Sequence, residues 1–200
     1  MLKLYEYPPS GNCYKIRLLL TQLDITFERI PLDIVKRETR TAEFLQKNPN
    51  GKIPLLEIEP GKYLPESNAI IYYFSQNTPF FPKDTFEQAQ VMQWMFFEQY
   101  SHEPNIATSR YWISVLGKAE EYKEALQQKH KAGNQALSIM EEHLKQHEFF
   151  VGNSYSIADI CLFAYTHVAD EGGFDLNQFP AIKAWIKRVK EQPKYLSITQ

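Results

Sequence analysis

Groups that can donate hydrogen bonds or attack as nucleophiles gather between residues 7 and 13. Tyr7, Ser10, Asn12 and Cys13 bring a phenol, a hydroxyl, a carboxamide and a thiol into one short stretch. Ser10 admits two interpretations, because serine is a favoured helix cap and its hydroxyl is also a donor to a charged ligand. The residue types therefore predict either a capped helix start or a polar site at that start.

A second polar pair, Glu66 and Ser67, also stands where a helix is expected to begin. The first-turn amides of a helix point out of its N-terminal end and favour an anion there. An acid beside a hydroxyl suits the two charges of a zwitterion, since the hydroxyl and amides can take its carboxylate and the acid its ammonium group. The same two residues would also make an ordinary helix start without a ligand.

The elements that must position these groups are short up to about residue 77. Apolar alternation and the placing of Pro, Gly and Asn predict the order strand, helix, strand, helix, strand, strand, helix. The first two strands flank a helix and are expected to pair in parallel, whereas the last two share a tight turn and must be antiparallel. We therefore predict a mixed four-stranded sheet with three helices. The predicted ranges, in order, are 2–7, 12–23, 25–31, 41–47, 53–59, 62–64 and 66–76.

The remainder of the chain has the long apolar periods of helices. We predict helices over 86–116, 118–147, 156–170 and 178–190. Pro104 should interrupt and bend the first of them, because proline lacks a backbone donor and its ring clashes with the preceding turn. The chain is thus divided into an α/β domain at 1–77, a linker at 78–85 and an all-α domain at 86–200.

Length and composition exclude several classes of protein. The chain has 200 residues, 44% hydrophobic and 23% charged, with a formal net charge of -2, which is typical of a globular protein of one or two domains. Without a basic stripe, nucleic acid is not an expected partner. No stretch approaches the roughly 20 apolar residues of a membrane-spanning helix, and the first residues lack the apolar core of a signal peptide. We expect a cytoplasmic protein that makes no membrane contact.

Four motifs, in this order along the chain, resemble those of the cytosolic glutathione S-transferases, and in particular the serine-type members similar to the theta and beta classes. The resemblance implies a thioredoxin-like N-terminal domain that binds glutathione, followed by an all-helical domain, and a homodimer that acts in detoxification. Each motif alone is weak, but together they cover nearly the whole chain. They are SGNCYKIR at 10–17, NPNGKIP at 48–54, ESNAI at 66–70 and SIAD at 156–159.

The resemblance implies that glutathione is the co-substrate and that the protein favours its thiolate over the thiol, whose pKa in water is about 8.5. By analogy with the serine-type members, Ser10 is the expected catalytic donor to the sulfur. Tyr7 and Asn12 are the alternatives, and Asn12 is equally well explained as the helix cap. Cys13 is expected to be a half-buried helix residue, because Ser10-x-x-Cys13 replaces the attacking sulfur of the thioredoxin-type Cys-x-x-Cys with oxygen.

The same resemblance assigns the rest of the glutathione site. A cis bond between Ile53 and Pro54 would let Ile53 pair its backbone with the cysteinyl part of the tripeptide. Ser67 would take the γ-glutamyl carboxylate and Glu66 the ammonium group. Lys52 would reach the glycyl carboxylate, with a solvent-facing side chain as the equal alternative.

A hydrophobic electrophile is the expected second substrate, and Pro9, Arg110 and Tyr111 are the candidates for its pocket. Isomerisation, peroxide reduction and dehalogenation use the same thiolate and stay open, as does a non-catalytic regulator or interaction protein with this fold. Metal chemistry has little support, because His143 and His147 have ligand spacing but no third ligand nearby. No metal is therefore expected.

The last motif has a structural interpretation. Ser156 and Asp159 have the spacing of a capping box, in which the serine accepts from helix amides and the acid reaches back to the serine amide. We therefore expect this motif to begin a helix of the second domain rather than to bind a ligand.

Overall fold

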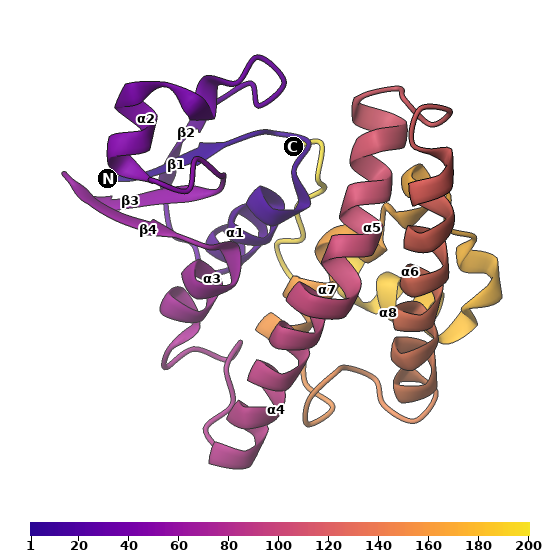
Figure 1. The fold of residues 1–200 in the computed structure, drawn as a ribbon. Coiled ribbons are helices and arrows are strands. Elements are labelled where there is room, and N and C mark those ends of the chain that lie inside the picture. Colours follow the sequence, from indigo (N-terminus) through magenta and orange to yellow (C-terminus); the bar gives the residue numbers. More distant parts are fainter. The chain divides into compact units, whose positions relative to one another are not determined.

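The structure, a computed structural model, describes residues 1–200 and divides into two compact units. The first contains Met1–Gln76 together with Pro193–Gln200, and the second contains Asn77–Gln192. The first unit is the α/β part and the second is helical (Figure 1). The predicted fold class, an α/β domain followed by an all-α domain, is confirmed.

The first unit is built on a four-stranded sheet in the order β2-β1-β3-β4. Strand β1 pairs in parallel with β2 and antiparallel with β3, and β3 pairs antiparallel with β4. The mixed sheet predicted from the order of elements is therefore present. The strands are β1 (Leu2–Glu6), β2 (Phe27–Pro31), β3 (Leu55–Glu59) and β4 (Lys62–Pro65).

Three helices cover this sheet, α1 (Gly11–Gln22), α2 (Ala42–Lys47) and α3 (Ser67–Ser75). Helices α1 and α3 lie side by side on one face of the sheet and α2 lies on the other (Figure 1). Most of α1 is buried, and it takes two charged side chains, Lys15 and Arg17, into the interior with it. The start of α1 and the start of α3 are thereby held close together.

The last residues of the chain return to the first unit, which differs from the predicted assignment of 86–200 to one helical domain. The Tyr14 hydroxyl donates to the carbonyl of Leu196 at 2.6 Å. Arg17, which pairs with the buried carboxylate of Glu6, donates to the carbonyl of Ile198 at 2.7 Å. The segment Pro193–Gln200 thus accepts, with its backbone carbonyls, hydrogen bonds from buried donors of α1. No periodic pattern in the sequence predicts this role.

The second unit is a bundle of five α-helices with short helical turns between them. Helix α7 is its core, because every residue from Ile157 to Thr166 is buried. Trp185 of α8 is also fully buried. The helices are α4 (Thr85–Phe97), α5 (Glu103–Arg110), α6 (Lys123–Leu144), α7 (Ile157–Thr166) and α8 (Pro180–Lys190).

The long helix predicted over 86–116 is interrupted, as the proline predicted, by a change of hydrogen-bond pattern. A π-helical turn at Glu98–His102 precedes α5, and a second one at Tyr111–Val115 follows it. Pro104 stands in the first turn of α5, where a missing backbone donor costs nothing. The first of these turns therefore separates α4 from α5.

The predicted linker packs on the second unit. The Ile157 amide donates to the carbonyl of Phe80 at 3.0 Å, and the Gln88 carboxamide donates to the carbonyl of Pro82 at 3.0 Å. Asp84 then caps α4 through the amides of the next turn. None of the helices has the length and apolar character needed to cross a membrane.

Candidate functional site

Ser10 is the N-cap of α1. Its backbone is extended and its Oγ accepts from the amide of Cys13 at 3.4 Å. The Ser10 amide donates to the carbonyl of Tyr7 at 2.8 Å, which fixes the turn between β1 and α1. A hydroxyl that accepts a hydrogen bond still carries its own hydrogen. Capping and donation to a ligand are therefore compatible roles for this half-exposed side chain.

Cys13 is completely buried, not half-buried as predicted. Burial raises the pKa of the Cys13 thiol to about 12, although hydrogen bonding to Ser10 and to the Tyr7 backbone opposes the rise. Because only a thiolate is an effective nucleophile, this cysteine is not poised for attack at neutral pH. The nearby nucleophile must come from elsewhere if the site performs thiol chemistry.

A hydrogen-bonded chain joins the first turn of α1 to the first turn of α3. Lys15 Nζ donates to Ser67 Oγ at 3.3 Å and to Asn68 Oδ1 at 3.1 Å. Ser67 Oγ in turn donates to Asn12 Oδ1 at 3.3 Å. The predicted site residues Asn12 and Ser67 are thus brought together. Lys15 was not predicted as a site residue; its only signal was a lysine three residues after Asn12 in the same helix.

The start of α3 has an unusual backbone. Glu66, an exposed residue, has φ 70°, a value that side chains other than glycine rarely adopt. Such a conformation costs of order 1–3 kcal/mol and is often found at ligand sites. Ser67, the next residue, is buried with 5% of its surface exposed. The turn thus presents an exposed carboxylate and the first amides of α3 side by side.

The loop before β3 contains the cis bond expected from the resemblance, between Ile53 and Pro54. Asn48 holds this loop, because its carboxamide donates to the carbonyl of Lys52 at 2.8 Å and accepts from the amide of Asn50 at 3.2 Å. The backbone of Ile53 is therefore presented by a loop fixed from within.

A hollow of about 300 Å³ lies beside this loop. Three cationic side chains line it, and no carboxylate does. Arg40 is packed over Gly51, since a Cβ at Gly51 would collide with the guanidinium group, and it donates to the carbonyl of Asn50 at 3.0 Å. The hollow is thus positively charged. Its lining residues are Ile34, Arg37, Thr39, Arg40, Gly51, Lys52 and Ile53.

The candidates for the electrophile pocket lie in different units. Pro9 is half-exposed next to Ser10. Arg110 is largely buried in the helical unit, and its Nε donates to Glu171 Oε2 at 2.7 Å in an ion pair. Tyr111 is half-exposed and begins the second π-helical turn. The charge of Arg110 is thus already compensated within its own unit.

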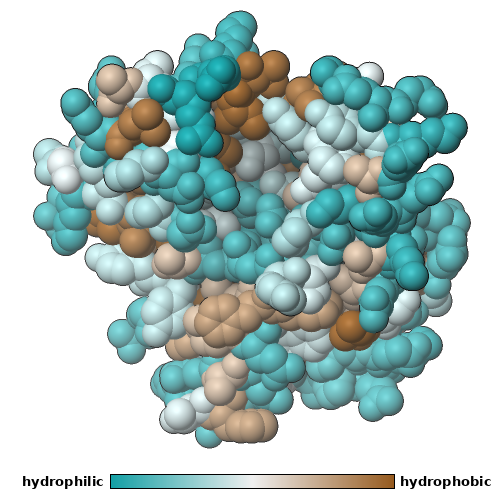
Figure 2. All heavy atoms as spheres, in the orientation of Figure 1, coloured by the Kyte–Doolittle hydropathy of each residue, from teal (hydrophilic) through white to brown (hydrophobic).

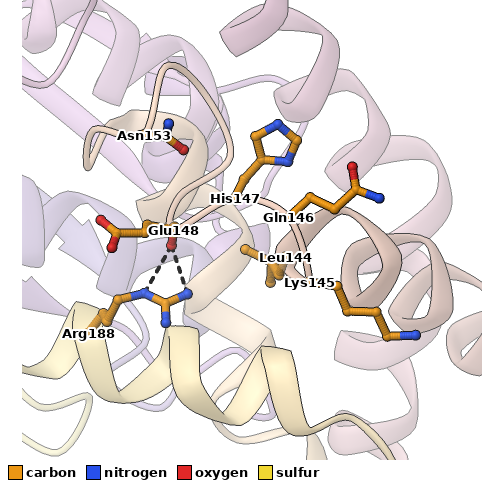
Figure 3. A pocket seen from close by; sticks show the side chains of 7 residues that line it. All are labelled: Leu144, Lys145, Gln146, His147, Glu148, Asn153 and Arg188. Atoms are coloured by element: carbon orange, nitrogen blue, oxygen red, sulfur yellow. Dashed lines mark hydrogen bonds between the residues drawn. The ribbon is translucent and has the colours of Figure 1, made fainter.

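A hollow of about 420 Å³ in the second unit lies where α6 ends and faces α8 (Figure 3). Arg188 Nε and Nη2 donate to the carbonyl of Glu148 at 3.0 and 2.9 Å. His147 lies at its edge with its ring stacked on His143, and no cluster of His, Cys, Asp and Glu with the makings of a metal site is present. None of the predicted site residues lines this hollow, which contains Leu144, Lys145, Gln146, His147, Glu148, Asn153 and Arg188.

Two family models match the chain, the glutathione S-transferase N-terminal domain over residues 1–76 and the glutathione S-transferase C-terminal domain over residues 100–193. The chain belongs to the glutathione S-transferase family. The resemblance stated from the four motifs is confirmed by these matches, which together span most of the chain.

Solved structures of this family are similar along the whole chain. A glutathione S-transferase from Pseudomonas fluorescens is 48% identical with a TM-score of 0.97, covering 100% of this chain and 99% of that one. A possible glutathione S-transferase from Rhodopseudomonas palustris is 43% identical with a TM-score of 0.98, covering 100% and 90%. Among curated relatives, the disulfide-bond oxidoreductase YfcG of Escherichia coli is 27% identical, covering 96% of this chain and 92% of its own length. Family and fold are thus established, and the roles of single residues remain predictions.

Proposed function

We propose that this protein is a glutathione transferase in which the Ser10 hydroxyl stabilises the glutathione thiolate for attack on hydrophobic electrophiles. The observation that carries the proposal is the geometry of the α1 cap. Ser10 uses an oxygen lone pair to accept from the Cys13 amide, and this bond leaves the hydroxyl able to donate to a sulfur at the helix end. The α1 dipole, with no acidic residue in the first turn, favours a negative charge at the same place.

The magnitudes suffice without further catalytic groups. A hydrogen bond to a charged sulfur is worth roughly 1.5–3 kcal/mol, and a helix N-terminus adds about 0.3–1 kcal/mol. At 1.36 kcal/mol for each pKa unit, the two effects lower the thiol pKa by about one to three units. That shift makes the thiolate abundant at neutral pH.

Recognition of the tripeptide follows from the three other structural features. The first backbone amides of α3, beginning with that of Ser67, suit the γ-glutamyl carboxylate, and the exposed Glu66 suits its ammonium group. The backbone of Ile53, before the cis proline, suits the cysteinyl part. The positively charged hollow beside Lys52 suits the glycyl carboxylate. All three features belong to the first unit.

Disulfide chemistry by Cys13 has less support, because the Cys13 thiol is buried and its pKa is raised to about 12. Isomerase, peroxidase or dehalogenase activity would use the glutathione thiolate that we propose for conjugation. A regulator with this fold would bind glutathione weakly or leave the pKa of its thiol unchanged.

The proposal is tested by calorimetry with glutathione and by conjugation of a chloro-dinitro aromatic compound. We expect wild-type protein to bind glutathione and to conjugate it. The Ser10→Ala variant should bind glutathione but lose about 10- to 30-fold in rate at neutral pH, because the thiolate fraction falls. An unchanged rate would assign the role to Tyr7 or Asn12. Absence of binding at millimolar glutathione would favour a regulator.

We also propose that the protein forms a homodimer. Phe86, Phe96 and Tyr100, on α4 and the turn after it, have 71%, 65% and 89% of their surface exposed. On the face shown in Figure 2, hydrophobic residues form separate patches among hydrophilic ones. Large exposed aromatic side chains are typical of interfaces. Equilibrium sedimentation should give twice the chain mass, and a monomer at all concentrations would contradict the proposal.

A further inference from the structure

Lys15 is the one lysine of the protein whose side chain is completely buried. Lysine is almost never fully buried unless its ammonium group is satisfied, because removing that charge from water is costly. Here the ammonium group donates to Ser67 Oγ at 3.3 Å and to Asn68 Oδ1 at 3.1 Å. A buried cation therefore lies directly behind the first turn of α3.

The direction of the hydrogen bond between Lys15 and Ser67 follows from this cation. An ammonium group has three donors and no acceptor, so Ser67 Oγ must accept from Lys15. The Ser67 hydroxyl hydrogen is then directed to Asn12 Oδ1, at 3.3 Å. Because the carboxamide oxygen of Asn12 faces Ser67, its NH2 group points another way. The chain Lys15 to Ser67 to Asn12 thus fixes which end of the Asn12 carboxamide is turned toward α3.

Asn12 is an alternative donor to the glutathione sulfur that is expected from the sequence. It stands in the first turn of α1, two residues after the Ser10 cap, and is half-exposed. Lys15 is three residues further on, so that Asn12 and Lys15 share one face of α1. This face meets the start of α3, where the γ-glutamyl carboxylate is proposed to bind.

We propose that Lys15 is a positioning residue: through Ser67 it holds the Asn12 carboxamide with its NH2 group directed to the glutathione sulfur, as a second donor to the thiolate. The inference rests on the proposed function and deepens it. Its consequence is that the binding site of the γ-glutamyl carboxylate and the site that stabilises the thiolate are coupled, because Ser67 belongs to both sites. Removing the hydrogen-bonding group of Lys15 or of Ser67 should therefore alter the pKa of a thiol that neither residue contacts.

The experiment measures the pKa of the bound glutathione thiol, by its ultraviolet thiolate absorbance, and the dissociation constant in the same samples. The variants are Lys15→Met, Ser67→Ala, Asn12→Ala and the double variant K15M/N12A. Methionine matches the length of lysine and removes its charge and donors. The exposed Lys62→Met on β4 is the matched control, expected to equal wild type.

We expect each single site variant to raise the pKa of the bound thiol by about one unit, a tenfold change in the proton equilibrium. K15M and S67A should also weaken binding, whereas N12A should change mainly the pKa. The double variant should show no larger rise than N12A alone, because the residues act through one donor. If K15M fails to fold, as judged by circular dichroism, S67A decides the matter, because it removes the same series of hydrogen bonds.

A pKa equal to that of wild type in K15M or S67A, with binding weakened, would overturn the inference and leave Lys15 only a support for the γ-glutamyl seat. Ser10→Ala, measured in parallel, separates this failure from that of the proposed function. If S10A raises the pKa of the bound thiol and K15M and S67A do not, only the inference fails. If the wild-type complex itself shows no lowering, both fail.

Discussion

Two helices of this protein begin at a capping serine, α1 at Ser10 and α7 at Ser156, but the surroundings of the two hydroxyls differ. Ser156 is buried, and its Oγ accepts from the Ala158 amide and donates to Asp159 Oδ2 at 3.2 Å. Ser10 is half-exposed, and the first turn of α1 contains no acid. The positive end of α7 is compensated by its own carboxylate, whereas that of α1 is left for another anion.

The difference shows that the same local signal can belong to folding or to chemistry. In α7 the hydroxyl has all its partners inside the protein, so its contribution is to stability. In α1 the cap bond uses only the acceptor side of the hydroxyl, so a ligand can use the donor side. The comparison predicts that variants at the two helix starts will separate stability from thiol chemistry.

The largest effect is expected at the start of α7, for Asp159→Ala. Asp159 accepts from the amides of Phe150 and Ser156 at 3.2 and 2.9 Å and from Trp185 Nε1 at 2.9 Å. Removing the carboxylate leaves these three buried N–H donors and the Ser156 hydroxyl without their acceptor, at about 1–3 kcal/mol each. Urea unfolding should show a loss of about 3 kcal/mol or more. The exposed Glu142→Ala serves as control, and a comparable loss in both variants would contradict the account.

A smaller effect is expected for the cap serine itself. Ser156→Ala should lower the free energy of unfolding by about 1 kcal/mol, because the first amides of α7 lose one acceptor. The pKa of glutathione bound to this variant should equal that of wild type. The exposed Ser138→Ala, a helix surface change, controls for loss of a hydroxyl. A raised thiol pKa in the Ser156 variant would show that the two caps are not distinct in function.

Cys13, whose amide donates to the Ser10 cap of α1, should be replaceable. Cys13→Ala is expected to keep the thiol pKa of bound glutathione within a few tenths of a unit, since the raised pKa of Cys13 keeps it protonated. A small destabilisation, about 1 kcal/mol, is expected from the cavity. Loss of conjugation in a folded variant would instead assign the chemistry to the cysteine. Thiol reagents should modify native wild-type protein slowly, because both cysteines are buried.

The titration of Asp159, at the start of α7, should also affect the pH dependence of stability. Burial raises the pKa of Asp159 from its usual 3.8 to about 6, so the native state binds more protons than the unfolded state between these values. Its contribution to stability therefore decreases as the pH rises from about 4 to about 6. Burial lowers the pKa of His167 from 6.5 to about 4, and its contribution increases over nearly the same range.

Asp159→Asn removes the first of these opposing contributions. The slope of the unfolding free energy against pH should become more positive than in wild type, by up to about 1.4 kcal/mol per pH unit. Urea titrations at several pH values between 4 and 7 measure it. Equal slopes in the two proteins would show that Asp159 does not titrate in this range.

Much of the fold followed from local patterns. The crossover helix between the first two strands and the tight turn between the last two dictated a mixed sheet, and the structure has it. The capping box at Ser156 was also predictable, because its residues lie three apart in sequence. The return of Pro193–Gln200 to the first unit was not, since it depends on backbone carbonyls that any sequence possesses.

The candidate site was predictable to a smaller extent. The positions of Ser10 and Ser67 at helix starts followed from composition and motif. The positive φ of Glu66 and the burial of Lys15 did not, because both result from the packing of α1 against α3. A lysine in an apolar helix stripe is interpreted as a surface residue until its tertiary partners are known.

The measurement that tests the central claim most directly is the pKa of the glutathione thiol bound to wild type and to Ser10→Ala. The account predicts a wild-type value about one to three units below that of free glutathione, and a rise of about one to two units when the Ser10 hydroxyl is removed. A wild-type value equal to that of the free peptide, or equal values in the two proteins, would contradict it.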